Sequence, residues 1–257
     1  MTPGQAIALV GASIAAGVMN SMAGGGTLVT FPTLLASGFT PLLANGTSTV
    51  SLVPGSAAAA FGYAKELRGR RKEVLTFTIP SLVGGCVGAW LTRRAGDALF
   101  ATLVPWLILG ATVLFILQEP ISRYVFRNKQ PVVHPGPLRI ALVAAFQLAV
   151  AIYGGFFGAG MGILILAALG QLGWVDIHEM NAMKNIVAVC INGTATVTFV
   201  ILGQVVWPVA GMMAAGAIAG GYGGARFAKR LDQKTVRRIV VLVGLGIATW
   251  MFIRQWG

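Results

Sequence analysis

Charged residues are scarce in this chain, and acidic ones are scarcer still. Of its 257 residues, 10% are Asp, Glu, Lys or Arg, and only seven are Asp or Glu. All seven lie in loops or at the caps of expected helices. This distribution argues against a carrier that shuttles protons on an intramembrane carboxylate, and against an enzyme built on paired carboxylates.

The chain also has only two cysteines and two histidines. Cys86 and Cys190 lie in apolar helical stretches, and His134 and His178 are far apart without metal-ligand spacing. A disulfide framework, a metal site and a cofactor are therefore not expected. No Ser-His-Asp set stands at a plausible depth either, so an integral-membrane enzyme is disfavoured.

Apolar sequence, by contrast, is abundant. Hydrophobic residues make up 56% of the chain, and several runs are long enough to cross a bilayer, which takes roughly 20 helical residues. The net charge of +12 could suit a nucleic acid, but the Lys and Arg residues form short clusters between the apolar runs. Membrane topology and anionic headgroups explain such clusters. We therefore predict an all-α polytopic membrane protein that binds no nucleic acid.

The apolar sequence divides into ten runs, five on each side of a polar linker. The runs span residues 5–22, 27–37, 41–63, 74–92, 98–118, 138–157, 160–172, 177–203, 207–225 and 236–253. No charged residue precedes the first run, so we expect it to be retained and not cleaved as a signal peptide. The predicted organisation is a first membrane repeat, 1–118, a basic cytoplasmic linker, 119–137, and a second membrane repeat, 138–257.

The two short runs, 27–37 and 160–172, decide how the repeats are related. If they count as crossings, each half has an odd number of spans and the repeats are inverted; if they do not, the repeats are parallel. The inverted arrangement places 15 basic residues on one side and three on the other, whereas the parallel one gives 10 against 8. The positive-inside rule therefore favours inversion, with both termini outside the cytoplasm. Whether the short runs fully cross stays open.

Two motifs recur in the two halves. Asn20-Ser-Met-Ala-Gly-Gly-Gly-Thr-Leu returns as Gly154-Gly-Phe-Phe-Gly-Ala-Gly-Met-Gly, and Asn45-Gly-Thr-Ser-Thr-Val returns as Asn181-Ala-Met-Lys-Asn-Ile. Repeated apolar halves with glycine-rich breaks are typical of secondary transporters that bind substrate between the halves. We expect the glycine-broken short helices to meet at the membrane midplane.

Each glycine-rich break is a candidate binding element. Glycine permits positive φ and a sharp reversal, and free amides at the start of the following half-helix offer an anion site. Broken backbone at that depth must be covered by protein or line a wet cavity. The alternative is that the glycines only allow close helix packing. Two breaks at equivalent positions favour the site.

The helix after each break begins with an expected cap and carries a polar stripe. The caps are Thr40 with Pro41, and Asp176 with Glu179. The stripe of the second half comprises Asn181, Lys184, Asn185, Ala188 and Asn192, and its counterparts in the first half are Asn45, Ser48, Thr49, Leu52 and Ser56. Both sets follow helical spacing, and we expect the two stripes to face each other.

Lys184 is the residue that most needs an explanation. It lies seven residues after Ile177, hence about 10 Å into its helix and near the bilayer midplane. An intramembrane lysine costs on the order of 2.5 to 3.5 kcal/mol and usually lines a pathway or pairs with a partner. The alternative is that its stem lets it reach the cytoplasmic surface. With no carboxylate at equivalent depth, a buried cation beside amide-rich breaks implies an anionic ligand.

These arguments give a predicted substrate site drawn from both halves. It comprises Asn20, Gly24, Gly25, Gly26, Thr27, Asn45, Ser48, Thr49, Gly158, Gly160, Met161, Asn181, Lys184 and Asn185. No residue is predicted to be catalytic or to bind metal. A coupling proton or cation is left open, and proton coupling would have to use His178, Lys184 or the substrate.

At these residues the chain resembles the sulfite exporter TauE/SafE family, also called the toluene-sulfonate uptake permease family. The matching pieces are the first glycine break, the run that begins at Asn45, and Asn181-Ala-Met-Lys-Asn with the later Ile191-Asn-Gly. The resemblance implies a carrier in the bacterial inner membrane for small sulfur-containing anions such as sulfite, thiosulfate, sulfonates or sulfoacetate. It fixes neither the anion nor the direction of transport.

The expected function is alternating-access transport of such an anion. A passive anion channel is the first alternative, and a structural membrane protein is a more distant one. Gly216, Gly220 and Gly224 recur at four-residue spacing and could mark a helix contact within or between subunits, so the oligomeric state stays open.

Overall fold

The structure, a computed structural model, describes residues 1–22, 24–67, 71–126, 136–227 and 233–256, and its regular elements there are all helices. The helices are α1 (Pro3–Met22), α2 (Thr27–Ala36), α3 (Pro41–Gly62), α4 (Arg71–Phe126), α5 (Pro137–Phe156), α6 (Met161–Gln171), α7 (Ile177–Ile201), α8 (Trp207–Phe227) and α9 (Gln233–Trp256). Each of the ten predicted apolar runs is found in one of them.

Among the described residues, four segments are long and apolar enough to cross a membrane: α1, α5, α7 and residues Glu73–Leu117 within α4. The α4 segment is 45 residues long, which is enough for two crossings. Gly96, with φ 68° and ψ 171°, bends the chain between the predicted runs 74–92 and 98–118. The prediction of a polytopic all-α protein is thus consistent with the lengths and composition of the helices.

The two short helices are half-spans. α2 has 10 residues and α6 has 11, so each is about 15 to 17 Å long, or roughly half the thickness of the hydrocarbon core. Positive φ angles at Gly24, Gly25, Gly158 and Gly160 turn the chain before each of them. Both short runs are therefore helices, as predicted, but they are too short to cross a bilayer alone.

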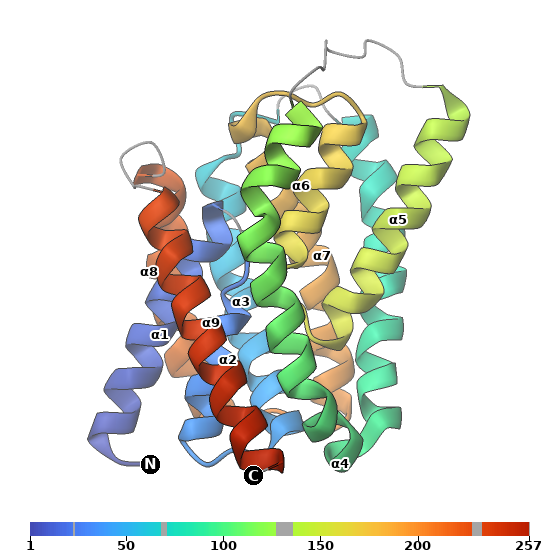
Figure 1. The fold of residues 1–257 in the computed structure, drawn as a ribbon. Coiled ribbons are helices and arrows are strands. Elements are labelled where there is room, and N and C mark those ends of the chain that lie inside the picture. The colour runs from blue at the N-terminus through green and yellow to red at the C-terminus, as the bar shows by residue number, and fades with distance from the viewer. Residues whose placement is uncertain (23, 68–70, 127–135, 228–232, 257) are drawn as a thin grey trace.

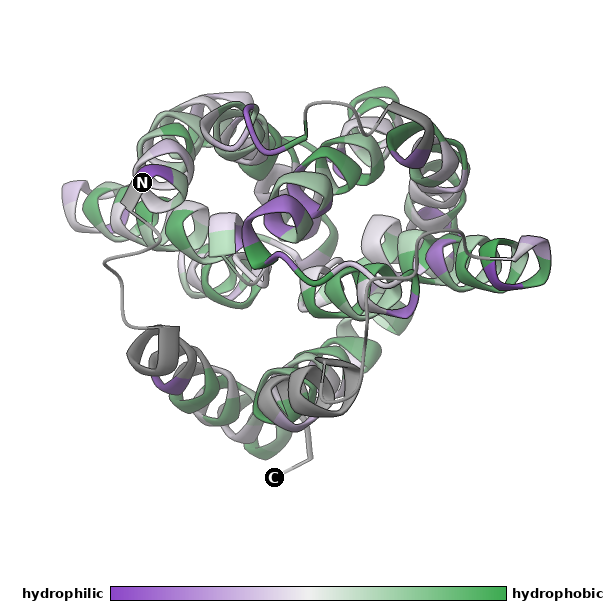
Figure 2. Cartoon of the chain, turned by 90° about the horizontal axis from the view of Figure 1, so that it is seen from above, coloured by the Kyte–Doolittle hydropathy of each residue, from purple (hydrophilic) through white to green (hydrophobic). Residues whose placement is uncertain are grey.

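The longer helices form two bundles, and each bundle combines helices from both halves of the sequence. The first bundle consists of α1, α3 and α8, and the second consists of α5, α7 and the part of α4 before Gly96. α3 packs against α7 where the bundles meet. The part of α4 after Gly96 packs against α9, where Trp106 and Phe252 have ring centroids 5.0 Å apart. Figure 2, viewed from above, shows α9 and the C terminus at one edge of the molecule.

Glycines let α8 approach α1 closely. A Cβ atom on Gly220 would collide with the carbonyl oxygen of Ile14, and one on Gly216 or Gly224 would collide with the hydroxyl of Ser13 or Ser21. The four-residue glycine spacing therefore marks a contact within this chain, as small residues do between membrane helices.

Phenylalanines hold the two short helices against the second part of α4. Phe31 of α2 packs edge-to-face on Phe157, with ring centroids 5.3 Å apart, and on Phe100 at 6.4 Å. Phe115 belongs to the same buried cluster and lies directly beside Gly25. Edge-to-face aromatic pairs and apolar burial thus fix the position of the broken segments.

The predicted cap of α7 is present in the structure. For α3, the predicted N-cap residue is correct, but the predicted capping hydrogen bond is not formed. Asp176 accepts hydrogen bonds from the amides of His178, at 2.7 Å, and Glu179, at 3.1 Å. Thr40 is the N-cap residue of α3, but its side chain makes no capping hydrogen bond. The amide of Leu42 donates instead to Oδ1 of Asp97, at 3.2 Å, because the bend in α4 brings that carboxylate to the start of α3.

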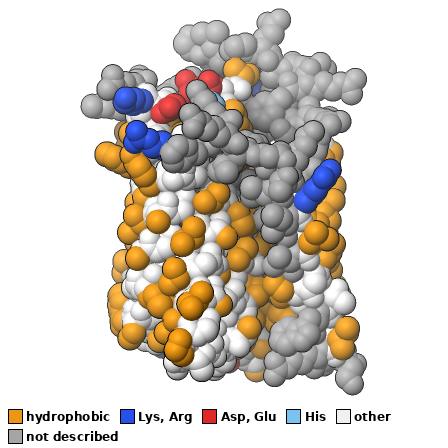
Figure 3. All heavy atoms as spheres, turned by 90° about the vertical axis from the view of Figure 1, so that its left-hand side faces the viewer, with side chains coloured by type: hydrophobic (Ala, Val, Ile, Leu, Met, Phe, Trp, Pro, Cys, Tyr) orange, Lys and Arg blue, Asp and Glu red, His pale blue; other side chains and the backbone are white. Residues whose placement is uncertain are grey.

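Apolar side chains are spread over the face shown in Figure 3, and charged ones gather toward its upper end. Large apolar side chains such as those of Ile7, Leu75 and Ile201 are more than half exposed. In water such a surface would promote aggregation, whereas a lipid environment accommodates it.

Candidate functional site

The two glycine breaks meet inside the molecule. A Cβ atom on Gly24 would lie 2.8 Å from the Cα atom of Gly162, so the first break needs glycine for space as well as for its φ of 84°. Gly160, the N-cap of α6, has φ 77° and lies against Ala111 of α4. The expectation that the short helices start close together is thus consistent with these contacts.

The beginning of α2 is held by Asn20, the third residue from the end of α1. Oδ1 of Asn20 accepts a hydrogen bond from the amide of Gly26, with 2.8 Å between the two atoms. The first amides of a helix have no partner within it, so this side chain provides one. The amides of the first turn of α2 and the positive end of its dipole are directed toward the middle of the molecule.

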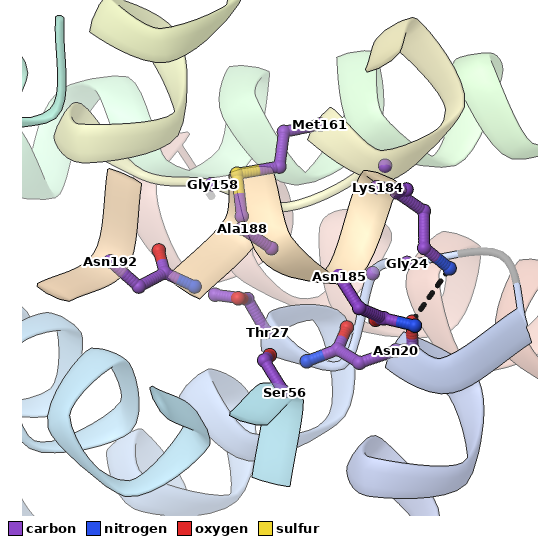
Figure 4. A pocket seen from close by; sticks show the side chains of 12 residues that line it. Asn20, Gly24, Thr27, Ser56, Gly158, Met161, Lys184, Asn185, Ala188 and Asn192 are labelled. Atoms are coloured by element: carbon purple, nitrogen blue, oxygen red, sulfur yellow. Dashed lines mark hydrogen bonds between the residues drawn. The ribbon is translucent and has the colours of Figure 1, made fainter. Parts of the chain in front are cut away.

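A small cavity lined by polar side chains and glycines lies between the breaks and α7. Its lining residues are Asn20, Gly24, Gly25, Thr27, Ser56, Gly158, Met161, Gly162, Lys184, Asn185, Ala188 and Asn192. Figure 4 shows the side chains of Asn185 and Asn192 from α7 facing those of Asn20, Thr27 and Ser56 from the first half of the chain. Both halves therefore contribute to one polar space.

Lys184 is buried at this cavity, with 1% of its surface exposed. Its Nζ donates to the backbone carbonyl of Asn20 at 2.7 Å and to Oδ1 of Asn181 at 3.1 Å. Among the described residues it has no carboxylate partner. Burying a charge without a counter-charge is costly, so the lysine creates a strong local preference for an anion.

Two other polar side chains reach the cavity with unused hydrogen-bonding capacity. Nδ2 of Asn185 donates to the carbonyl of Ser21 at 3.3 Å, but its Oδ1 has no partner. The hydroxyl of Ser56 has no partner at all and is fully buried. Buried polar groups are nearly always paired, so unpaired ones beside a cavity point to a ligand or water that they would bind.

The predicted site residues fall into two groups. Eight of them line the cavity: Asn20, Gly24, Gly25, Thr27, Gly158, Met161, Lys184 and Asn185. The other six, which are Gly26, Asn45, Ser48, Thr49, Gly160 and Asn181, lie outside the lining. Their role as binding residues stays a prediction.

Several residues of the second group support the cavity from behind. Asn181 accepts from Lys184, and Ser48 shares a hydrogen bond of 2.6 Å with Thr30 of α2. Nδ2 of Asn45 donates to the carbonyl of Phe156, the last residue of α5, at 3.0 Å. These contacts position the broken segments.

Four lining residues were absent from the predicted site: Ser56, Gly162, Ala188 and Asn192. Ser56, Ala188 and Asn192 belong to the two predicted polar stripes but were not included in the predicted site, and Gly162 ends the second break. Taking each stripe into the site in full would have found the first three. The stripes lie on α3 and α7, which pack against each other.

This architecture defines a class of protein. Discontinuous helices that meet at a polar site between two halves of a polytopic helical protein are typical of secondary membrane transporters. The sequence profile described as "Sulfite exporter TauE/SafE" matches residues 9–251. The chain belongs to this family, which confirms the resemblance seen in its motifs.

Curated proteins similar to the chain are named as transporters. It is 29% identical over 238 residues to "Probable membrane transporter protein ORF9" of Sinorhizobium sp, covering 92% of this chain and 88% of that one. It is 26% identical to a "Probable membrane transporter protein" of Haemophilus influenzae, covering 93% and 91% of the two chains. It is also 26% identical to "Probable membrane transporter protein YfcA" of Escherichia coli, covering 89% and 82%. The protein is thus a multi-pass membrane protein of a transporter family.

Proposed function

We propose that this protein is a secondary-active carrier that moves small sulfur-containing anions across the bacterial inner membrane by alternating access. Sulfite, thiosulfate, sulfonate and sulfoacetate are the candidate substrates. The observation that carries the proposal is Lys184, a buried cation without a carboxylate partner among the described residues, which faces a cavity built from both glycine breaks.

The chemistry of the cavity suits an oxyanion. The ammonium of Lys184 supplies charge, and Asn20, Asn185 and Asn192 carry amide groups that can donate hydrogen bonds. The first turns of α2 and α6 add the positive ends of two helix dipoles. Helix starts of this kind bind anionic groups without any further charged residue.

Inverted repeats are supported by matching glycine contacts. Gly84 of α4 lies against the carbonyl of Leu148 on α5, and Gly220 of α8 lies against the carbonyl of Ile14 on α1. Gly84 and Gly220 are as far apart along the chain as Asn45 and Asn181, which start the recurring motif in the two halves. The contact recurs one turn later, between Gly88 and Ile152 and between Gly224 and Val18. A pseudo-twofold relation between the halves accounts for these pairs.

The direction of the helices supports inversion. Figure 1 shows α1 beginning at the lower end of the molecule and α5, its proposed counterpart, beginning at the upper end. Arg139 in the first turn of α5 and Arg226 in the last turn of α8 lie at helix ends on the upper side. Arg93 and Arg94 lie near the lower bend of α4. We assign the upper side to the cytoplasm and both termini to the periplasm.

Counterflow into proteoliposomes tests the proposal. Vesicles are loaded with sulfite, thiosulfate, sulfate or methanesulfonate, and entry of the sulfur-radiolabelled anion is followed for the wild type and for Lys184→Gln. A carrier gives counterflow with at least one anion, and the variant loses it. A passive channel does not couple entry to the internal anion.

The matched control is Lys65→Gln, which removes a lysine that is exposed after the end of α3. This variant should transport as the wild type does. If Lys184→Gln also transports normally, the lysine is not part of the site. Absence of exchange with all four anions would refute the proposed substrate class.

A further inference from the structure

Hydrogen bonds from two adjacent side chains of α7 join the two bundles. Lys184 and Asn185 belong to the second bundle, and they donate to the carbonyls of Asn20 and Ser21 at the end of α1 in the first bundle. Carbonyls in the last turn of a helix have no partner within it, and they form the negative end of the helix dipole. The end of α1 thus supplies a partial negative charge for the ammonium of Lys184.

We infer that the protein is an obligatory anion exchanger, because the contact between Lys184 and Asn20 holds the two bundles together whenever the site is empty. This inference rests on the proposed function and adds to it the way in which the two directions of transport are coupled.

Alternating access requires the two bundles to move against each other, which separates α7 from α1. Asn181 remains with Lys184 during this movement because it is three residues away on the same helix. The carbonyl of Asn20 does not, because it belongs to the other bundle. In the empty protein the ammonium would therefore cross the intermediate state with one neutral acceptor in apolar surroundings, which is unfavourable for a charge.

A bound anion removes this obstacle. Its oxygens compete with the carbonyl of Asn20 for Nζ of Lys184, and they travel with the lysine as the bundles move. The loaded site then contains a paired charge throughout the transition. The loaded protein should therefore change conformation faster than the empty one, which is the condition for exchange without net transport.

The other side of the interface carries a similar contact without a charge. Nδ2 of Asn45, on α3 of the first bundle, donates to the carbonyl of Phe156 at the end of α5 in the second bundle. A neutral donor can exchange this carbonyl for water at little cost. The charged contact at Lys184 is consequently the one that distinguishes the empty from the loaded protein.

The test compares two fluxes in the same proteoliposomes, with the membrane potential held at zero by potassium and valinomycin. Sulfur-radiolabelled sulfite leaves preloaded vesicles either into buffer with excess unlabelled sulfite or into buffer without any anion that exchanges. If another of the four anions proves to be the one that exchanges, it replaces sulfite in both arms. We expect exchange to exceed net efflux at least tenfold, a barrier difference of about 1.4 kcal/mol.

Variants show whether the contact causes the difference. Lys184→Gln removes the charge, so any flux that this variant retains should show a ratio of exchange to net efflux near one. Asn185→Ala removes only a neutral hydrogen bond to α1, so its ratio should stay that of the wild type. Thr198→Ala is a second control, because its hydroxyl donates within α7, to the carbonyl of Thr194. If Lys184→Gln is inactive, the ratio measured for the wild type decides.

Two outcomes contradict the inference, and they differ from failure of the proposed function. Equal rates of exchange and net efflux in the wild type would show that the empty protein changes conformation as fast as the loaded one. A high ratio that persists in Lys184→Gln, or a ratio near one in Asn185→Ala, would show that the contact of Lys184 is not the one that holds it. Absence of any flux in the wild type would instead refute transport of these anions, and the inference with it.

Discussion

Nζ of Lys184 on α7 lies 2.7 Å from the backbone carbonyl oxygen of Asn20 on α1, and this hydrogen bond crosses the interface between the two helix bundles. It places the buried cation beside the first glycine break, where Asn20 also binds the amide of Gly26. Asn20 thus contacts both the buried ammonium of Lys184 and the first glycine break. Changes at the break should therefore affect the lysine.

Gly24→Ala should destabilise the protein more than Gly38→Ala. Both glycines have positive φ, 84° and 93°, which costs about 1 to 2 kcal/mol for alanine. Only Gly24 also faces backbone, at Gly162, whereas a Cβ atom on Gly38 has no neighbour within 4 Å. Thermal unfolding in detergent should show the larger loss for Gly24→Ala, and counterflow should be lost in this variant alone. Equal effects would mean that the breaks do not need to touch.

Gly220→Ala should weaken the contact between α8 and α1. The added methyl group would collide with the carbonyl of Ile14, and the backbones would have to separate, at a cost of about 1 to 3 kcal/mol. Gly223→Ala is the matched control on the same helix, because a Cβ atom there has no neighbour within 4 Å. The control should leave the unfolding temperature unchanged or raise it slightly. A lower temperature for the control would contradict the packing described here.

Ser56→Ala should lower anion affinity without lowering stability. The buried hydroxyl of Ser56 has no hydrogen-bond partner, so its removal loses no bond within the protein. A lost hydrogen bond to the anion would cost about 0.5 to 1.5 kcal/mol, or roughly 2- to 12-fold in affinity. Unfolding in detergent and the concentration dependence of counterflow measure the two quantities. Ser13→Ala, outside the cavity, should leave the affinity unchanged.

Cysteine labelling can test the proposed orientation. In a background without Cys86 and Cys190, Arg93→Cys should react with a membrane-impermeant maleimide in cells with a permeabilised outer membrane. Lys65→Cys should react only after the inner membrane is opened, because it lies at the opposite end of the bundles. Both parent side chains are exposed, so access alone does not distinguish them. The reverse pattern would place the termini in the cytoplasm.

Local sequence signals predicted the helices and much of the cavity. The ten apolar runs, the cap at Asp176 and both glycine breaks depend on composition and spacing over a few residues, and all of them are present in the structure. The polar stripes on α3 and α7 were also visible, because residues three and four positions apart share one face of a helix. Ser56 and Asn192, at the ends of these stripes, line the cavity but were not included in the predicted site.

Other contacts had no signal in the sequence. Asp97 caps α3 from 55 residues away, and no local pattern connects the two. Across the interface, Lys184 donates to a backbone carbonyl, and every residue has such a carbonyl. The side chain of Asn20 therefore could not have predicted this contact. Likewise, the glycine spacing of α8 indicated a close contact but did not identify α1 as its partner.

The sequence by itself therefore determined an apolar helical chain, its interruptions, its polar faces and a lysine within an apolar run. Only the tertiary structure decided that helices from both halves combine in each bundle, that Gly24 touches Gly162, and that the lysine is buried against the end of α1. The physical reason is that hydrophobicity and helix formation depend on neighbouring residues, whereas packing depends on shape and on backbone groups brought together from distant positions.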